Sequence, residues 1–321
     1  MGHTTRLAPS PTGALHLGNA RTFLINWLCA RQSGWKVTLR VDDLDGPRTK
    51  PGADQAAIDD LQWLGIDWDS GPTRQSTRTS VYAAAVEMLL RDGFAYYCNC
   101  TRKEVESAAS APHADDGAAV YPGTCRGLYR TRADAIAASG RVPAVRFAVR
   151  DGRFDFTDNF AGPRSFQLAR QLGDFVIQKS DGTAAYQLAV VVDDAEAGVT
   201  QVIRGDDLIE STPRQILLYR ALNLAQQIPA YTHLPLIVGE DGKRLAKRHG
   251  DTRLGEYRKR GVPAERVLAL LAKWCGVRSA GKDLESASMQ KLLADFRLDR
   301  VPRAPITFTR HDDAFLRGYR S

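Results

Sequence analysis

The stretch Pro9-Ser10-Pro11-Thr12-Gly13-Ala14-Leu15-His16-Leu17-Gly18-Asn19 follows a segment of strand-like composition, residues 4–8, and precedes a segment with apolar residues at helical spacing, residues 20–31. We therefore predict a strand, a loop and a helix that begins near Gly18. A helix N-terminus presents unpaired backbone N–H groups and a partial positive charge, which suit a phosphate. His16 can add a hydrogen bond or a positive charge, and the missing side chain at Gly18 lets a base or a ribose approach the backbone. Alone, the pattern is most often an ordinary strand-to-helix turn.

A second, distant stretch is strongly basic: Gly242-Lys243-Arg244-Leu245-Ala246-Lys247-Arg248-His249-Gly250. By itself, such a run is typical of a solvated loop. The two stretches together, in this order, resemble the HIGH and KMSKS signatures of class I aminoacyl-tRNA synthetases, with His16-Leu17-Gly18-Asn19 and Arg244-Leu245-Ala246-Lys247-Arg248 at the matching positions. Arg244 replaces the first lysine of the second signature and Ala246 replaces its serine, whereas Lys247 is retained.

Further motifs are similar to the glutamyl branch of this family: Arg6-Leu7-Ala8-Pro9-Ser10-Pro11-Thr12-Gly13, Leu39-Arg40-Val41-Asp42-Asp43-Leu44-Asp45, Val190-Val191-Val192-Asp193-Asp194 and Val202-Ile203-Arg204-Gly205-Asp206-Asp207-Leu208. The resemblance covers nearly the whole chain. It implies an α/β fold in which a Rossmann-like parallel sheet is split by a zinc-bearing α+β insertion and followed by a short helical tail.

The resemblance also implies a division of the chain into four parts. Residues 1–95 would form the first half of the nucleotide-binding core, and residues 96–185 an insertion that approaches the acceptor nucleotide. Residues 186–250 would form the second half of the core and end in the KMSKS-like loop. Residues 251–321 would form a helical tail without an anticodon-binding domain.

Composition agrees with this interpretation. The chain has 321 residues, of which 43% are hydrophobic and 25% charged, as in soluble globular proteins with one large or two moderate domains. No apolar run approaches the roughly 18 residues of a membrane span, and the N-terminus lacks an apolar signal region. We expect a cytoplasmic monomer that does not bind membranes. A net charge of +7 and a pI of about 9.2 favour a polyanionic partner such as tRNA.

Hydrophobic periodicity predicts the main elements. The predicted strands are at 37–41, 144–149, 154–158, 175–178 and, as a nearly all-apolar buried strand, 186–194. The predicted helices are at 20–31, 54–95 with breaks at 65–69 and 92–93, 210–224 and 253–275. In open α/β sheets, ligands gather at the carboxyl ends of the strands. The Pro9–Asn19 loop and the acidic residues after the strand at 37–41, namely Asp42, Asp43 and Asp45, would lie there.

By matching position, the resemblance assigns binding of the substrate amino acid to Arg6, Ala8, Ser10, Asp42, Tyr186 and Arg204. Two arginines suit a substrate with a side-chain carboxylate, because guanidinium groups bind carboxylates bidentately. The family has a glutamate where this chain has Asp42, so the contact with the substrate amino group and the amino acid selected are both open. A surface ion pair of Arg204 with Asp206 or Asp207 is the alternative to a binding role. For Asp43 and Asp45 the alternative is a solvated acidic turn.

Three of the five cysteines are clustered in the sequence: Cys98, Cys100 and Cys125. Clustered thiols in a cytoplasmic protein suggest a metal site, and zinc prefers four ligands. His113 could be the fourth ligand. The resemblance implies Tyr121 instead, because glutamyl-queuosine tRNA(Asp) synthetases carry a Cys-x-Cys…Tyr-x-x-x-Cys site of this spacing. No general base lies nearby in the sequence, so this zinc is expected to be structural. Cys29 and Cys275 lie in apolar helical segments and are interpreted as buried hydrophobic residues.

The family activity implied is ATP-dependent activation of glutamate to an adenylate, followed by transfer to a tRNA. Attack of the substrate carboxylate on the α-phosphate needs alignment and cations around the departing pyrophosphate. His16 and Lys247 are the predicted catalytic residues, and Mg²⁺ would accompany ATP. The predicted ATP-binding residues are His16, Gly18, Asn19, Arg244 and Lys247.

Two acceptors are open. The short enzymes of the branch lack an anticodon-binding region and attach glutamate to queuosine in the anticodon of tRNA(Asp). The chain length and the Cys/Tyr cluster favour this acceptor. The segment 296–318 resembles the start of the extra region of full-length synthetases, which favours a truncated glutamyl-tRNA synthetase that charges the 3′ end of tRNA(Glu). A catalytically inactive tRNA-binding paralogue and a different nucleotidyltransferase of the same topology are the remaining alternatives.

Overall fold

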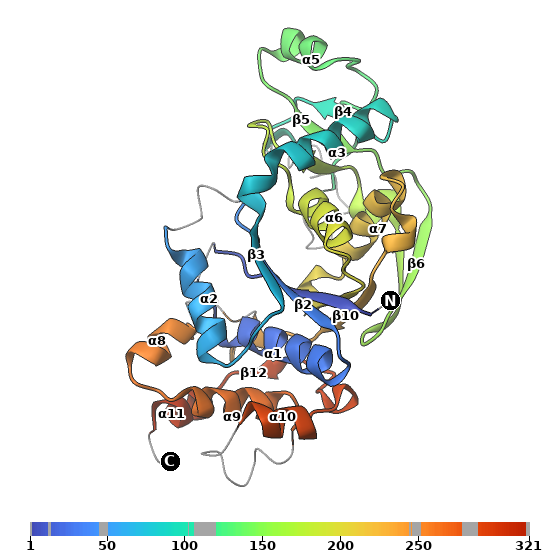
Figure 1. Cartoon of the computed structure of the whole chain (residues 1–321). Coiled ribbons are helices and arrows are strands. Elements are labelled where there is room, and N and C mark those ends of the chain that lie inside the picture. Colours follow the sequence, from blue (N-terminus) through green and yellow to red (C-terminus); the bar gives the residue numbers. More distant parts are fainter. Residues whose placement is uncertain are drawn as a thin grey trace.

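The computed structural model of the protein describes residues 2–11, 14–44, 51–101, 103–105, 120–243, 245, 252–277 and 288–318 (Figure 1). Its centre is a five-stranded parallel sheet of order β10-β9-β1-β2-β3. The strands are β1 (Thr4–Leu7), β2 (Lys36–Val41), β3 (Ser70–Arg74), β9 (Gln201–Gly205) and β10 (Ala230–Leu234). Because neighbouring parallel strands cannot be joined by a tight hairpin, each connection crosses a face of the sheet. The predicted strands at 4–8 and 37–41 are confirmed.

The first crossover is helix α1 (Leu17–Gln32), which confirms the predicted helix after the Pro9–Asn19 loop. Leu24 and Leu28 of α1 are fully buried in one cluster with the sheet residue Leu7 and with helix α9 (Ala264–Trp274). Arg21 of α1 is buried in the same region, where it donates hydrogen bonds to the carbonyl oxygens of Pro235 (2.7 Å) and Trp274 (3.1 Å). α1 is therefore fixed to the strand end after β10 and to the tail.

Strand β3 was not predicted, because its sequence Ser-Gly-Pro-Thr-Arg is poor in β-formers. It is the edge strand of the sheet, where a proline is tolerated. A Cβ at Gly71 would lie 2.2 Å from the carbonyl oxygen of Leu39. Only glycine therefore allows this edge strand to approach β2. The segment 54–95 is accordingly divided into α2 (Ala53–Trp63), β3 and α3 (Thr79–Arg91).

The prediction of a strand at 186–194 is wrong, since this segment belongs to helix α6 (Tyr186–Glu196). Its apolar run is buried between the sheet and other helices, and periodicity alone cannot distinguish a fully buried helix from a fully buried strand. The fourth strand of the sheet is instead β9. Helix α7 (Ser211–Ala221) follows it, in agreement with the predicted helix at 210–224.

A second region follows α3 in the chain and contains an antiparallel sheet of order β4-β5-β8 and the hairpin β6-β7. In Figure 1, β4, β5 and α5 lie beyond α3, whereas β6 runs beside α7. Its elements are β4 (Ala95–Cys98), α5 (Arg132–Ser139), β5 (Ala144–Phe147), β6 (Arg153–Asp158), β7 (Gly162–Gln167) and β8 (Phe175–Gln178). The three strands predicted between 144 and 178 are confirmed, and β7 was missed. This region shares a second apolar cluster with α6 and α7.

The C-terminal segment packs beneath α1, as Figure 1 shows. It contains α8 (Leu254–Lys259), α9, α10 (Met289–Asp295), β12 (Ile306–Thr307) and α11 (Arg310–Arg317). The helix predicted at 253–275 is interrupted between α8 and α9, where Gly261 has φ +74° and Pro263 starts a new helix. β12 pairs in parallel with β11 (Ile237–Val238). In the described part of the chain, every helix is too short to span a membrane.

We predict that Phe296→Ala lowers the free energy of unfolding by about 3–5 kcal/mol, because it leaves a cavity in the cluster that joins the tail to α1. Urea unfolding followed by tryptophan fluorescence measures the change. Val142→Ala is the control, since Val142 is 45% exposed and its truncation should cost no more than about 0.5 kcal/mol. A small effect of Phe296→Ala would show that the tail is not part of this core.

Candidate active site

His16 is the N-cap of α1. Its Nδ1 accepts hydrogen bonds from the backbone N–H groups of Gly18 (3.1 Å) and Asn19 (3.4 Å). Because Nδ1 is an acceptor, the ring proton of neutral His16 lies on Nε2. A Cβ at Gly18 would lie 3.0 Å from the imidazole, so glycine gives this cap its room. Asn19 completes the cap, since its Oδ1 faces the backbone N–H of His16 at 3.5 Å.

The two sequence motifs are held by backbone contacts within them and next to them. The backbone N–H of Leu17 donates to Thr252 (3.1 Å), and that of Leu254 donates to Leu15 (2.8 Å). Within the basic stretch, the N–H of Leu245 donates to Ile237 at 3.1 Å. The basic stretch is thus held beside β11 at Leu245, and the chain just after it is held beside α1. The predicted ATP-binding residues Arg244 and Lys247 themselves lie outside the described residues.

A buried network of arginines and aspartates lies at the carboxyl ends of β1 and β2. Asp194 of α6 accepts a hydrogen bond from Arg6 Nε (3.2 Å) and one from Arg40 Nη1 (2.5 Å). All three side chains are at most 6% exposed. Burial alone would raise the pKa of Asp194, but the charges of Arg6 and Arg40 and their hydrogen bonds outweigh it and lower this pKa. Asp194 therefore holds two guanidinium groups from different strands.

Asp42 belongs to the same network. Its carboxylate receives both Nε (2.6 Å) and Nη2 (3.3 Å) of Arg40, and its backbone N–H donates to the carbonyl oxygen of Pro9 (3.0 Å). Burial raises the pKa of Asp42, although Arg40 favours its charged form. The strand end after β2 and the Pro9 loop are thus side by side, as expected from the ends of parallel strands.

Arg204 of β9 is 5% exposed and makes no surface ion pair with Asp206 or Asp207 within the described residues, so that alternative is excluded. Nε donates to His233 Nε2 (2.9 Å), Nη1 to Gln215 Oε1 (2.8 Å), and Nη2 to Thr212 Oγ1 (2.9 Å) and to the carbonyl of Leu208 (3.3 Å). All these acceptors are neutral. Arg204 is therefore a buried cation for which the described part of the chain supplies no carboxylate within ion-pair distance.

The other predicted amino-acid-binding residues have different environments. Tyr186 begins α6 and is 38% exposed. Ala8 is half-buried and Ser10 is exposed, both in the segment after β1. Asp43 lies just beyond β2, where its carboxylate accepts hydrogen bonds from the backbone N–H (2.8 Å) and the hydroxyl (2.6 Å) of Ser76. Asp43 thus makes an ordered contact, whereas Asp45 lies outside the described residues.

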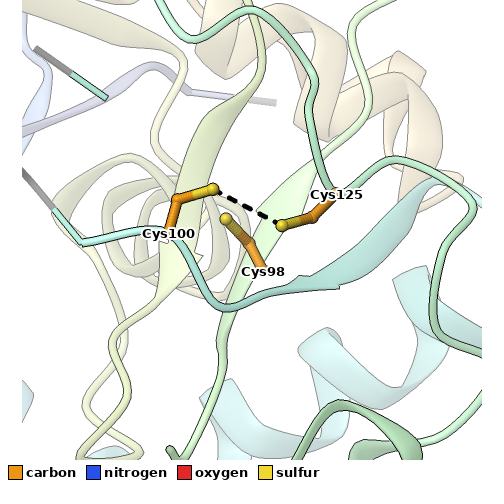
Figure 2. A group of neighbouring side chains, drawn as sticks. All are labelled: Cys98, Cys100 and Cys125. Carbon is orange, nitrogen blue, oxygen red and sulfur yellow. Dashed lines mark hydrogen bonds between the residues drawn. The ribbon is translucent and has the colours of Figure 1, made fainter. Parts of the chain in front are cut away.

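The three clustered cysteines come together in space, as Figure 2 shows. The sulfurs of Cys98, Cys100 and Cys125 all lie within 4.8 Å of one another. The hydroxyl of Tyr121 lies 3.4 Å from the sulfurs of Cys98 and Cys100 and accepts the backbone N–H of Cys125 at 2.8 Å. Thiolates bound to one tetrahedral zinc at about 2.3 Å would be separated by similar distances, so these residues fit the ion. His113 lies outside the described residues.

Arg146 of β5 adds positive charge to this cluster. Its Nε donates to the sulfur of Cys98 (3.2 Å), and its guanidinium lies 3.9 Å from the centre of the Tyr121 ring. Both contacts place positive charge beside possible metal ligands, which favours a thiolate at Cys98 and an electron-rich phenol oxygen at Tyr121. Cys29 and Cys275 are buried within the main apolar cluster, as predicted.

A cavity of about 330 Å³ lies behind the arginine–aspartate network. It shares Arg6, Arg40 and Asp194 with that network but extends to Lys36 and Val199. Lys36 is the first residue of β2 and Val199 precedes β9, so the cavity reaches toward the amino ends of the strands, away from His16. We do not assign it to the active site.

Sequence reasoning missed several residues that support the site: Arg40, Asp158, Asp194, Thr212, Gln215 and His233. Arg40 and Asp194 lie within motifs quoted for the resemblance, and a charged residue inside an otherwise apolar stretch was the available signal. Asp158 and His233 gave no such signal, since only the tertiary fold brings them together.

Comparison with known proteins decides the family. A family model described as the catalytic domain of class I tRNA synthetases (E and Q) matches residues 3–312. The chain belongs to this family. The parallel sheet with its crossover helices is accordingly the class I tRNA synthetase α/β fold, and the predicted resemblance to this family is confirmed.

Individual relatives refine the comparison. A glutamyl-Q tRNA(Asp) synthetase of Symbiobacterium thermophilum is 46% identical, with 98% of each chain covered. A glutamate–tRNA ligase of Carboxydothermus hydrogenoformans is 39% identical, with 98% of this chain but 66% of the relative covered. Among solved structures, a glutamate tRNA ligase of Elizabethkingia meningosepticum in complex with its amino acid matches with a TM-score of 0.81 at 28% identity, covering 98% of this chain and 69% of that one.

We predict that Asp194→Asn lowers the free energy of unfolding at neutral pH by about 3–5 kcal/mol, since it leaves two buried guanidinium groups without their shared anion. The pKa of Asp194 in the folded protein is below its ordinary value of 3.8, so the carboxylate stabilises fully above that value and the effect is lost as the pH falls through the lower pKa.

Urea titrations of both proteins at neutral pH and well below pH 3.8 provide the measurement. Asp155→Asn is a matched control, because Asp155 forms an exposed ion pair with Arg153 that solvent screens, so its loss should change stability little. Equal effects of the two substitutions would contradict the role given to Asp194.

Proposed function

We propose that this protein activates L-glutamate with ATP and transfers the glutamyl group to queuosine in the anticodon of tRNA(Asp), acting as a cytoplasmic monomer. The observation that carries the proposal is the buried Arg204 guanidinium, whose partners among the described residues are all neutral, in a chain that belongs to the class I (E and Q) family. The Symbiobacterium relative, 46% identical, bears the name of that activity.

Glutamate recognition follows from the two buried arginines. Arg6 is compensated by Asp194, whereas Arg204 lacks a carboxylate among the described residues. A cation held in a site of low dielectric constant selects an anionic ligand, so Arg204 would bind the side-chain carboxylate of glutamate. Ala8, Ser10 and Tyr186 would complete the binding surface. Asp42 would face the substrate amino group, with its carboxylate already paired with Arg40.

Adenylate formation needs alignment more than covalent help. His16 would donate from Nε2 to the triphosphate, and Gly18 and Asn19 would face the nucleotide at the N-terminus of α1. Lys247, with Arg244, would neutralise the departing pyrophosphate, and Mg²⁺ would supply further positive charge to the phosphates. The backbone contacts of Leu245 and Thr252 would direct that basic stretch toward α1.

Residues 96–185 would act as an insertion in the core, and residues 251–321 as a helical tail. Cys98, Cys100, Tyr121 and Cys125 would hold one Zn²⁺ in the insertion. The ion would be structural, because it would join β4 to the segment around Cys125 and no general base is among its described neighbours. The insertion would position the incoming tRNA.

Transfer of labelled glutamate tests the acceptor. We expect label on tRNA(Asp) that contains queuosine, and none on the same tRNA made without queuosine. Label on tRNA(Glu) alone would identify a truncated glutamyl-tRNA synthetase, in line with the 39% identical relative. Absence of glutamate-dependent ATP–pyrophosphate exchange would identify an inactive paralogue. Arg204→Gln should abolish glutamate-dependent ATP–pyrophosphate exchange, because the glutamine amide cannot supply the positive charge of the guanidinium.

Metal analysis tests the cysteine cluster. We expect about one zinc per chain by mass spectrometry, and its loss in Cys125→Ser. Cys29→Ser is the control, since Cys29 is a buried hydrophobic residue far from this cluster in the fold. Tyr121→Phe should lower zinc retention during dialysis against a chelator, whereas His113→Ala should not. The reverse result for these last two variants would make His113 the fourth ligand.

A further inference from the structure

A buried chain of side chains leads from the hairpin β6-β7 to Arg204. Asp158, the last residue of β6, contacts His233 of β10 with 2.6 Å between Oδ2 and Nδ1. On the other edge of the imidazole, His233 Nε2 lies 2.9 Å from Arg204 Nε. The side chains of Asp158 and His233 are both fully buried. The three residues come from three different strands, and none is a neighbour of another in the sequence.

The hydrogen-bond chemistry fixes the position of the imidazole proton. A guanidinium can only donate, so His233 Nε2 must carry a lone pair toward Arg204 Nε. The hydroxyl of Thr212, 3.4 Å from the same nitrogen, is also compatible with an acceptor there. The proton therefore lies on Nδ1, from which it is donated to Asp158. Burial and the charge of Arg204 lower the pKa of His233 despite Asp158, which agrees with a neutral ring.

Asp158 is itself held in one orientation. Its Oδ1 accepts backbone N–H groups of Phe160 (2.9 Å), Ala161 (2.7 Å) and His233 (3.1 Å). Oδ2 is thereby left for the His233 ring. Burial alone would raise the pKa of Asp158, but these hydrogen bonds lower it, so the group is a carboxylate that can only accept.

We propose that Asp158 and His233 are positioning residues for Arg204, and that they set glutamate affinity by imposing the imidazole tautomer that accepts from its guanidinium. This inference rests on the proposed glutamate-binding role of Arg204. Of the five N–H groups of Arg204, four bind within the described residues, so its plane is fixed and one N–H of Nη1 remains for a ligand. If the imidazole proton were on Nε2, the N–H groups of His233 Nε2 and Arg204 Nε would face each other. The guanidinium plane of Arg204 would then rotate away.

Asp158→Asn tests this mechanism with little change in volume. The three backbone N–H groups require an oxygen at the Oδ1 position, so the amide NH₂ must take the place of Oδ2 and donate to His233 Nδ1. The imidazole proton then moves to Nε2, opposite Arg204 Nε–H. We expect the KM for glutamate in ATP–pyrophosphate exchange to rise about 10- to 100-fold, with the KM for ATP unchanged within about twofold.

Two substitutions at His233 separate positioning from packing. In His233→Gln, the side-chain oxygen can occupy the place of Nε2 and accept from Arg204. In His233→Asn, the shorter side chain can reach Asp158 but leaves Arg204 Nε–H without its acceptor. We expect His233→Gln to retain a glutamate KM at least about tenfold lower than that of His233→Asn. Equal glutamate KM values in these two variants, or an unchanged glutamate KM in Asp158→Asn, would overturn the proposal.

Nitrogen NMR tests the tautomer without any substrate. In protein labelled with ¹⁵N-histidine, whose six histidines can be assigned by substitution, His233 should be protonated at Nδ1 in the wild type and at Nε2 in Asp158→Asn. Wild-type protonation at Nε2 would overturn the proposal whatever the enzyme's substrate. The wild type could instead give the expected NMR result but show no glutamate-dependent ATP–pyrophosphate exchange. That result would refute the proposed function and limit Asp158 and His233 to the orientation of Arg204. Thermal unfolding of each variant identifies any that do not fold.

Discussion

The contact on which the rest of this site depends is the bridge that Asp194 makes between Arg6 and Arg40. A carboxylate this deeply buried is stable only when cations and hydrogen bonds compensate its charge. Arg6 comes from β1, Arg40 from β2 and Asp194 from α6, so one anion fixes two strands and a helix that are far apart in the sequence. Arg40 in turn orients Asp42, and Asp42 is bound to the Pro9 loop through its backbone.

The two buried arginines of the site, Arg6 and Arg204, differ in whether their partners are charged. Arg6 faces a carboxylate of the protein, whereas Arg204 is surrounded by an imidazole, an amide, a hydroxyl and a carbonyl. Neutral acceptors orient a guanidinium without cancelling its charge. Gln215 is itself held in place, since its side-chain amide donates to Gln187, and the amide of Gln187 donates to Ser211. The charge of Arg204 therefore stays available to a ligand.

Local signals predicted much of the fold. The helix after His16, the strand ending before Asp42 and the cysteine cluster all depend on residues close in sequence, and motif spacing was enough to find them. The strand predicted at 186–194 is wrong because a run of buried apolar residues has no period that identifies a helix such as α6. β3 was missed because a close approach to β2, and not β-propensity, determines it. The contacts of Asp158 with His233 depend on the packing of the hairpin β6-β7 against β10, which no local pattern encodes.

The pairing of β11 with β12 has a consequence for biosynthesis. Ile237 and Val238 lie directly before the basic stretch, and their strand partner, Ile306–Thr307, is made much later by the ribosome. Proteins of this size begin to fold from the N-terminus while synthesis continues. The half of the molecule that carries Asp194 and Arg6 can therefore close early, but the support beside the basic stretch is completed only once β12 has emerged. A nascent chain would thus form the Arg6–Asp194 contact before the basic stretch has its full support.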